Sequence, residues 1–255
     1  MKTIIAIGGK EVGTLGKNGY LKKVVVDPFH RQILKRTGKQ HPNVLYISTA
    51  KDDSENYIAA FVKYYESLGC RKVEVLRLIR ENPSRREICK KIASADAVYV
   101  NGGNTHRMMG LWKRYGVDHM LKRAYEQGTI MSGHSAGAIC WFSYGDSDSF
   151  NKHRPFRVSA MGWIDAILCP HYDTEPIRQA TLQKILKRTP GKVGLAIDEC
   201  AALEIHNGQY RVLAVDVKSG ARRTYWDQGN YIIEELPKKT QFESLSSLLK
   251  RHPST

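Results

Sequence analysis

The chain has 255 residues, of which 42% are hydrophobic and 25% charged, a balance typical of globular proteins. This length suits one large domain or two small ones, and we expect a single domain over residues 1–255. Every apolar run is far shorter than a bilayer is thick, so we expect no association with a membrane.

The chain is strongly basic, with 40 Lys and Arg against 25 Asp and Glu and a formal charge of +15. Such an excess can mark a nucleic-acid-binding protein, but here the basic residues are scattered and accompany no nucleic-acid-binding motif. We therefore interpret them mainly as solvated surface, with an acidic substrate or partner as the alternative. The five cysteines show no metal or redox spacing, which predicts reduced thiols in a cytoplasmic protein without metal or cofactor.

In the first half of the chain, strand-like apolar runs alternate with amphipathic helical stretches. The expected strands are 3–7, 43–49, 72–78, 97–100 and 129–131. The expected helices are 27–37, 53–68, 84–94, 107–112 and 118–127. Repeated strand–loop–helix units predict an α/β fold, with a mostly parallel sheet covered by helices on both faces. Ligands bind such sheets beyond the carboxyl ends of the strands.

The second half of the chain is more mixed. It is expected to hold a helix at 136–142, a polar segment at 143–149, a strand at 163–168, a helix at 175–187 and a strand at 193–197. Small antiparallel strands are then expected at 201–205, 210–217 and 231–233. The Asn207-Gly208 turn is a strong hairpin signal between the first two.

The segment Gly133-His134-Ser135-Ala136-Gly137 carries the Gly-x-Ser-x-Gly pattern of a nucleophile elbow. It lies between a predicted buried strand and a small, apolar stretch that suits a helix beneath a sheet. Such a strand-to-helix turn exposes the serine hydroxyl above the sheet edge and aims free helix amides at the same point. The alternative is a serine with only a structural role in a tight turn.

A serine nucleophile needs a neighbouring base and an acceptor that orients the base. Of the nine histidines, His171 is the candidate, because it follows a predicted strand and a proline at the sheet edge that also carries Ser135. His134 adjoins the serine, but neighbours in a sharp turn point apart, so we expect it to line the pocket. The orienting acid stays open among four residues: Asp146, Asp148, Asp198 and Glu199.

A second glycine-rich turn, Asn101-Gly102-Gly103-Asn104, also follows a predicted strand and should lie at the same edge. Glycine lets the backbone approach a substrate closely, so one amide of this turn and the amide of Ala136 would form an oxyanion hole. Asn104 is expected to line the substrate pocket.

Together, residues 98–105, 133–138 and 170–172 resemble peptidase E, the aspartyl dipeptidase family, and its relative cyanophycinase. The similarity covers roughly residues 3–214, with the three motifs in family order. The resemblance implies a three-layer α/β/α sandwich related to class I glutamine amidotransferases. It also implies Ser135 as nucleophile, His171 as general base, and Gly103 and Ala136 as the oxyanion hole. Asp148 is the preferred acid, since Ser147-Asp148-Ser149 is similar to related sequences, with Asp146 and Glu199 as alternatives.

The resemblance further implies hydrolysis of dipeptides with an N-terminal aspartate. We expect a monomer or homodimer. A cation must then receive the substrate carboxylate, and four arginines are candidates: Arg107, Arg154, Arg157 and Arg178. Two alternatives remain on the same site, a cyanophycinase-like enzyme and an esterase. A non-catalytic basic binding protein ranks lower, because scattered charge lacks an element that reads nucleic acid.

Overall fold

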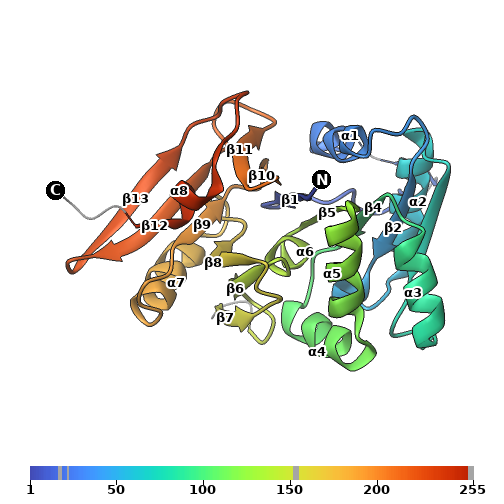
Figure 1. Ribbon diagram of the computed structural model, residues 1–255, viewed down its shortest axis with the longest axis horizontal. Coiled ribbons are helices and arrows are strands. Elements are labelled where there is room, and N and C mark those ends of the chain that lie inside the picture. Colours follow the sequence, from blue (N-terminus) through green and yellow to red (C-terminus); the bar gives the residue numbers. More distant parts are fainter. Residues whose placement is uncertain (17–18, 22, 152–154, 252–255) are drawn as a thin grey trace.

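The strands of the protein fall into two sheets (Figure 1). The structure, a computed structural model, describes residues 1–16, 19–21, 23–151 and 155–251. The first sheet has eight strands in the order β14-β11-β10-β1-β5-β4-β2-β3, and the second has six in the order β13-β12-β9-β8-β6-β7. The elbow serine and the candidate histidine follow strands of different sheets, β5 and β8.

The first sheet has a parallel core. Its five parallel strands are β1 (Thr3–Ile7), β2 (Asn43–Ile47), β3 (Lys72–Leu76), β4 (Ala97–Val100) and β5 (Ile130–His134). Three antiparallel strands extend it beyond β1: β10 (Ala201–His206), β11 (Gln209–Ala214) and β14 (Glu243–Ser244). The hairpin predicted at Asn207-Gly208 joins β10 to β11, as expected.

Helices cover both faces of this parallel core. Because successive strand residues point to opposite faces, Ile5 and Ile7 of β1 pack with α1 (Asp27–Arg36) and α2 (Glu55–Ser67). Ile4 and Ala6 pack instead with α3 (Arg85–Ala93), α4 (Thr105–Tyr115) and α5 (Val117–Gln127). A short 3-10 helix, η1 (Thr49–Lys51), follows β2. These layers confirm the expected α/β fold with a mostly parallel sheet between helices.

The second sheet combines strands from the middle and the end of the chain. Its members are β6 (Phe142–Ser147), β7 (Phe156–Ser159), β8 (Ile164–Cys169), β9 (Gly194–Ile197), β12 (Ala221–Asp227) and β13 (Asn230–Leu236). Helix α7 (Pro176–Lys187) packs on it through Leu182, Ile185 and Leu186. The short helix α8 (Leu245–Leu249) lies near the C-terminus. One apolar cluster contains buried residues of both sheets, so they share a core.

One local prediction is wrong. The helix expected at 136–142 is the single turn α6 (Ala136–Ile139), and β6 begins at Phe142. Residues 142–147 pair with both β7 and β8, and this pairing overrides the local helical pattern. Strand β12 was not predicted from the sequence; it carries Arg222 and Arg223, and both guanidiniums pair with carboxylates of β13. Among the described residues, no helix combines the length and apolarity needed to cross a bilayer.

Candidate active site

Ser135 occupies a strained turn between β5 and α6. Its φ of 52° and ψ of −116° are unusual for a residue with a side chain, and this strain characterises a nucleophile elbow. A Cβ at Gly137 would lie 2.0 Å from the carbonyl oxygen of Val100, so only glycine fits where α6 passes β4. The turn therefore has the predicted form, with the serine side chain at the end of the sheet.

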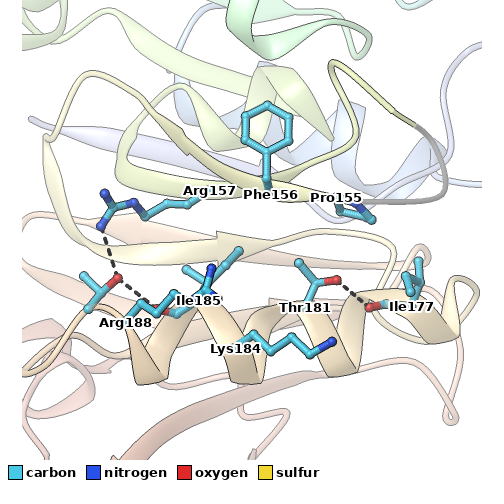
Figure 2. Close-up of a pocket in the computed structure, with 9 residues that line it drawn as sticks. Pro155, Phe156, Arg157, Ile177, Thr181, Lys184, Ile185 and Arg188 are labelled. Atoms are coloured by element: carbon cyan, nitrogen blue, oxygen red, sulfur yellow. Dashed lines mark hydrogen bonds between the residues drawn. The ribbon is translucent and has the colours of Figure 1, made fainter.

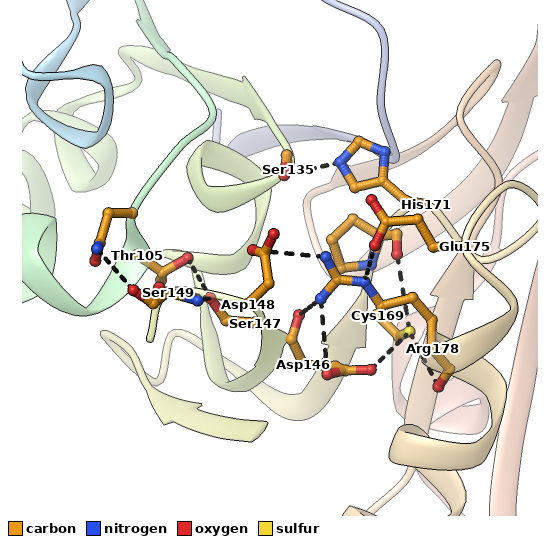
Figure 3. Close-up of polar contacts among 12 residues, drawn as sticks. Thr105, Ser135, Asp146, Ser147, Asp148, Ser149, Cys169, His171, Glu175 and Arg178 are labelled. Atoms are coloured by element: carbon orange, nitrogen blue, oxygen red, sulfur yellow. Dashed lines mark hydrogen bonds and ion pairs between the residues drawn. The ribbon is translucent and has the colours of Figure 1, made fainter. Parts of the chain in front are cut away.

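The imidazole of His171 reaches Ser135 from the second sheet. Its Nε2 lies 2.9 Å from the Ser135 Oγ, a hydrogen bond across 36 positions of sequence (Figure 3). His171 follows β8, and its backbone N–H donates to the carbonyl oxygen of Gly8, just after β1, at 3.2 Å. This bond ties the end of β8 to the first sheet, and the structure thus brings the predicted nucleophile and base together.

Glu199 holds the other nitrogen of the imidazole. Its Oε1 lies 3.1 Å from Nδ1 of His171, and its Oε2 lies 2.5 Å from Nζ of Lys10. The hydrogen bond to His171, followed by that to Lys10, outweighs desolvation and lowers the pKa of Glu199 to about 2. An ionised carboxylate therefore faces Nδ1, which fixes the tautomer that leaves Nε2 free to accept the serine proton.

The preferred acid of the sequence analysis, Asp148, does not contact the imidazole. Its Oδ1 faces Nη2 of Arg178 at 3.6 Å (Figure 3). Asp146, the alternative, is fully buried on β6, and its Oδ1 lies 3.7 Å from Nη1 of Arg178. Asp198 pairs with Arg222. The structure thus replaces Asp148 with Glu199 at Nδ1, because Arg178 of α7 draws both aspartates away from His171.

The buried environment of Asp146 changes its acidity. Desolvation is the largest effect and outweighs the attraction of Arg178, so the pKa of Asp146 rises to about 7. Arg178 is itself 2% exposed and also bonds Glu175, whose Oε2 accepts from its Nε at 2.6 Å. The three carboxylates thus form one cluster around the guanidinium (Figure 3).

Gly103 and Ala136, the predicted oxyanion donors, both lie next to Ser135. Gly103 follows β4 with a φ of 138°, and it lines the cleft together with Ser135. Ala136 begins α6, and the first amides of a helix have no partner within it. Asn104 lines the same cleft, but its side chain caps α4 by accepting from the Arg107 amide at 2.9 Å.

Ser135 and His171 lie where two pockets meet. The larger, of about 630 Å³, extends toward α4 and α7 and includes Arg107, Asp148 and Glu175. The smaller, of about 350 Å³, extends toward the segment after β1 and includes Lys10, Glu11 and His134. Lys51 and Gly103 line both. A peptide whose scissile carbonyl lies at Ser135 would thus have space on either side.

Two of the four candidate arginines line the larger pocket. Arg178 is enclosed by its three carboxylates, whereas Arg107 forms an exposed ion pair with Asp52. Arg157 lies elsewhere, in a groove of about 540 Å³ between β7 and α7 (Figure 2). There its guanidinium stacks over Tyr144 at 4.6 Å and bonds Thr189. Arg154 lies outside the described residues.

Three residues near the site were not singled out from the sequence: Lys10, Glu11 and Lys51. The sequence did indicate their position, because Lys10 and Glu11 follow β1, Lys51 follows β2, and the carboxyl ends of parallel strands meet at one edge of the sheet.

Within residues 1–16, 19–21, 23–151 and 155–251, no group of three or more His, Cys, Asp or Glu could hold a metal ion.

A model of peptidase family S51 matches residues 12–213 of the chain. The uncharacterized peptidase YgaJ of Bacillus subtilis strain 168 is 32% identical over 237 residues, covering 93% of this chain and 97% of YgaJ. The cyanophycinase of Nostoc sp. PCC 7120 is 22% identical over 219 residues, covering 82% of this chain and 70% of that enzyme.

The fold is also shared with solved structures. The crystal structure of a peptidase from an acI-B1 actinobacterium has a TM-score of 0.62 at 19% identity, covering 96% of this chain and 97% of that one. The resemblance inferred from the three motifs is thus confirmed. The chain belongs to peptidase family S51, the family of peptidase E and cyanophycinase.

Proposed function

We propose that the protein is a serine peptidase that hydrolyses short peptides through Ser135, His171 and Glu199. The observation that carries the proposal is the continuous chain of hydrogen bonds from the Ser135 hydroxyl through the imidazole to the Glu199 carboxylate. The strained turn at Ser135 and membership in a peptidase family support it.

The reaction follows from this geometry. His171 Nε2 takes the proton of Ser135 as Oγ attacks the peptide carbonyl carbon, and the amides of Gly103 and Ala136 receive the oxyanion. The imidazolium, stabilised by Glu199, then gives its proton to the leaving amine, and an acyl-enzyme remains. Water, deprotonated by His171, attacks the ester, which releases the acid product and restores the Ser135 hydroxyl.

We propose dipeptides with an N-terminal aspartate as the substrates, as in the aspartyl dipeptidases that the motifs resemble. Arg107 is the cation best placed for the substrate carboxylate, because it lines the larger pocket beside Ser135. Its present partner, Asp52, is an exposed carboxylate, and exchanging one exposed partner for another costs little free energy. Arg178 could not bind substrate without giving up its buried partner Asp146, which costs on the order of several kcal/mol.

Hydrolysis of a dipeptide panel tests the function. We expect Asp-X dipeptides to be cleaved, and a fluorophosphonate to label Ser135, with both activities lost in Ser135→Ala while the thermal unfolding midpoint is kept. Hydrolysis at the wild-type rate by Ser135→Ala would refute the proposal. Cleavage of cyanophycin or simple esters in place of dipeptides would support Ser135 as the nucleophile but would assign another class of substrate. Arg107→Met should raise KM for Asp-X more than for Ala-X.

A further inference from the structure

The side chain of His134, next to the nucleophile, is buried and lies against the Gly102-Gly103 turn. It is 4% exposed, and Nε2 lies 3.2 Å from the backbone nitrogen of Gly102. Nδ1 lies 3.1 Å from the hydroxyl of Tyr99 on β4. A Cβ at Gly102 would lie 2.7 Å from Nε2, so the imidazole edge is in close contact with the turn.

The contact with Gly102 points to one tautomer of His134. A backbone N–H can only donate, so accepting it requires the lone pair of Nε2. A neutral imidazole then carries its proton on Nδ1 and donates it to the Tyr99 oxygen. Burial lowers the pKa of His134 despite the carboxylate of Glu11, whose Oε2 is 3.7 Å from Nε2, and this favours the neutral form.

We propose that His134 is a positioning residue: it accepts the Gly102 N–H and thereby holds the next amide, that of Gly103, in place for the oxyanion. This inference rests on the proposed function, in which Gly103 is an oxyanion donor. The Gly102 N–H also lies 3.0 Å from Oδ1 of Asn101. That local bond stays within the turn, and the amides of Asn101 and Asn104 tie its two ends to Ile47 and Ala50. The bond to His134 adds a tie to β5, the strand that leads into Ser135.

The expected effect is on the chemical step. Losing an oxyanion-hole donor altogether typically lowers kcat by about 10²–10³-fold, and misplacing it should cost somewhat less. Removing the acceptor at position 134 should therefore lower kcat about 10–100-fold. The two pockets that bind the substrate keep their other walls, so KM should change by less than about threefold.

Two substitutions separate the acceptor from the bulk of the side chain. His134→Leu fills the space without an acceptor, whereas His134→Gln can present its carbonyl oxygen to Gly102. Tyr65→Phe is the matched control, because its hydroxyl bonds His30 at 2.8 Å within the same buried aromatic cluster but belongs to neither pocket. We expect His134→Leu to have a lower kcat than wild type and a lower rate of reaction between Ser135 and a fluorophosphonate. His134→Gln should restore most of both rates, and Tyr65→Phe should lower only the stability of the fold.

Wild-type rates in both assays for His134→Leu would overturn the inference while leaving the proposed function intact. Failure of the wild-type protein to react with the reagent or any peptide would instead count against the proposed function. A measurement independent of catalysis is ¹⁵N NMR of histidine-labelled wild-type protein, with the His134 ring assigned by through-bond correlation to its sequentially assigned backbone. We expect the Nδ1–H tautomer near pH 7, and the Nε2–H tautomer would overturn the inference even if the substituted proteins failed to fold.

Discussion

The carboxylate of Glu199 is shared between two partners, with Oε1 on His171 and Oε2 on Lys10. Glu199 follows β9 in the second sheet, whereas Lys10 follows β1 in the first. The ammonium thus holds the carboxylate from the side opposite the imidazole, and the same pairing raises the pKa of Lys10. Because both partners favour its charged form, Glu199 stays ionised throughout the pH range in which His171 would act as a base.

Glu199→Gln should lower kcat by about 10²–10⁴-fold, because a neutral amide can donate to Nδ1 and so favour the unproductive tautomer of His171. Asp148→Asn should change kcat less than about tenfold, since Asp148 faces Arg178 and not the imidazole. Steady-state kinetics of the two proteins on one substrate makes the comparison. A larger loss of kcat in Asp148→Asn than in Glu199→Gln would identify Asp148 as the acid that orients His171.

The folded-state pKa of Glu199, about 2, lies below the ordinary value of 4.5, so the folded protein binds its proton less readily than the unfolded chain. The resulting stabilisation is present above pH 4.5 and is lost as the pH falls toward 2. Its size should be roughly 1–2 kcal/mol, because solvent screens part of the interaction. The difference in unfolding free energy between wild type and Glu199→Gln, measured with urea, should shrink over this range. A difference in unfolding free energy that is constant with pH would contradict the lowered pKa of Glu199.

The contribution of Asp146 to the free energy of unfolding should depend on pH in the opposite direction to that of Glu199. Its folded-state pKa of about 7 lies above the ordinary 3.8, so the protonated form stabilises the fold below pH 4 and this contribution is lost as the pH rises through 7. We expect wild type to lose on the order of 2 kcal/mol relative to Asp146→Asn between pH 4 and pH 8. Urea unfolding at several pH values measures this loss. Parallel stability curves for the two proteins would show that Asp146 is ionised in the folded state throughout.

Gly103→Ala should impair both folding and catalysis. Its φ of 138° disfavours any side chain, and the new Cβ would lie 2.0 Å from the carbonyl oxygen of Ala50. The turn must therefore move, at a cost of about 2 kcal/mol or more and with a fall in kcat. Gly110→Ala, in an exposed and uncrowded position of α4, is the control and should stabilise the protein by about 0.5–1 kcal/mol. Equal effects of the two substitutions on kcat would argue against Gly103 as an oxyanion donor.

Much of the fold was predictable because its signals are local. The apolar runs of β1 and β4 are matched to the residue, and the breaks between strands and helices coincide with Gly, Pro and capping residues. The helix expected at 136–142 fails because β6 pairs with β7 and β8, and this tertiary pairing overrides the local pattern. Strand β12 was not predicted, and its charged Arg222 and Arg223 are neutralised by carboxylates of β13.

The sequence by itself predicted Ser135 and His171 as nucleophile and base, and the two side chains are hydrogen-bonded in the structure. The glycine spacing around Ser135 reports the backbone of the elbow directly, and His171 is recognisable because it ends a strand next to a proline. Only the tertiary structure decided the acid. Asp148 and Glu199 both follow strands, so chain order does not distinguish them, and the fold sets which carboxylate reaches Nδ1 of His171. Asp148 faces Arg178 of α7, whereas Glu199 contacts Lys10 through Oε2 and keeps Oε1 on His171.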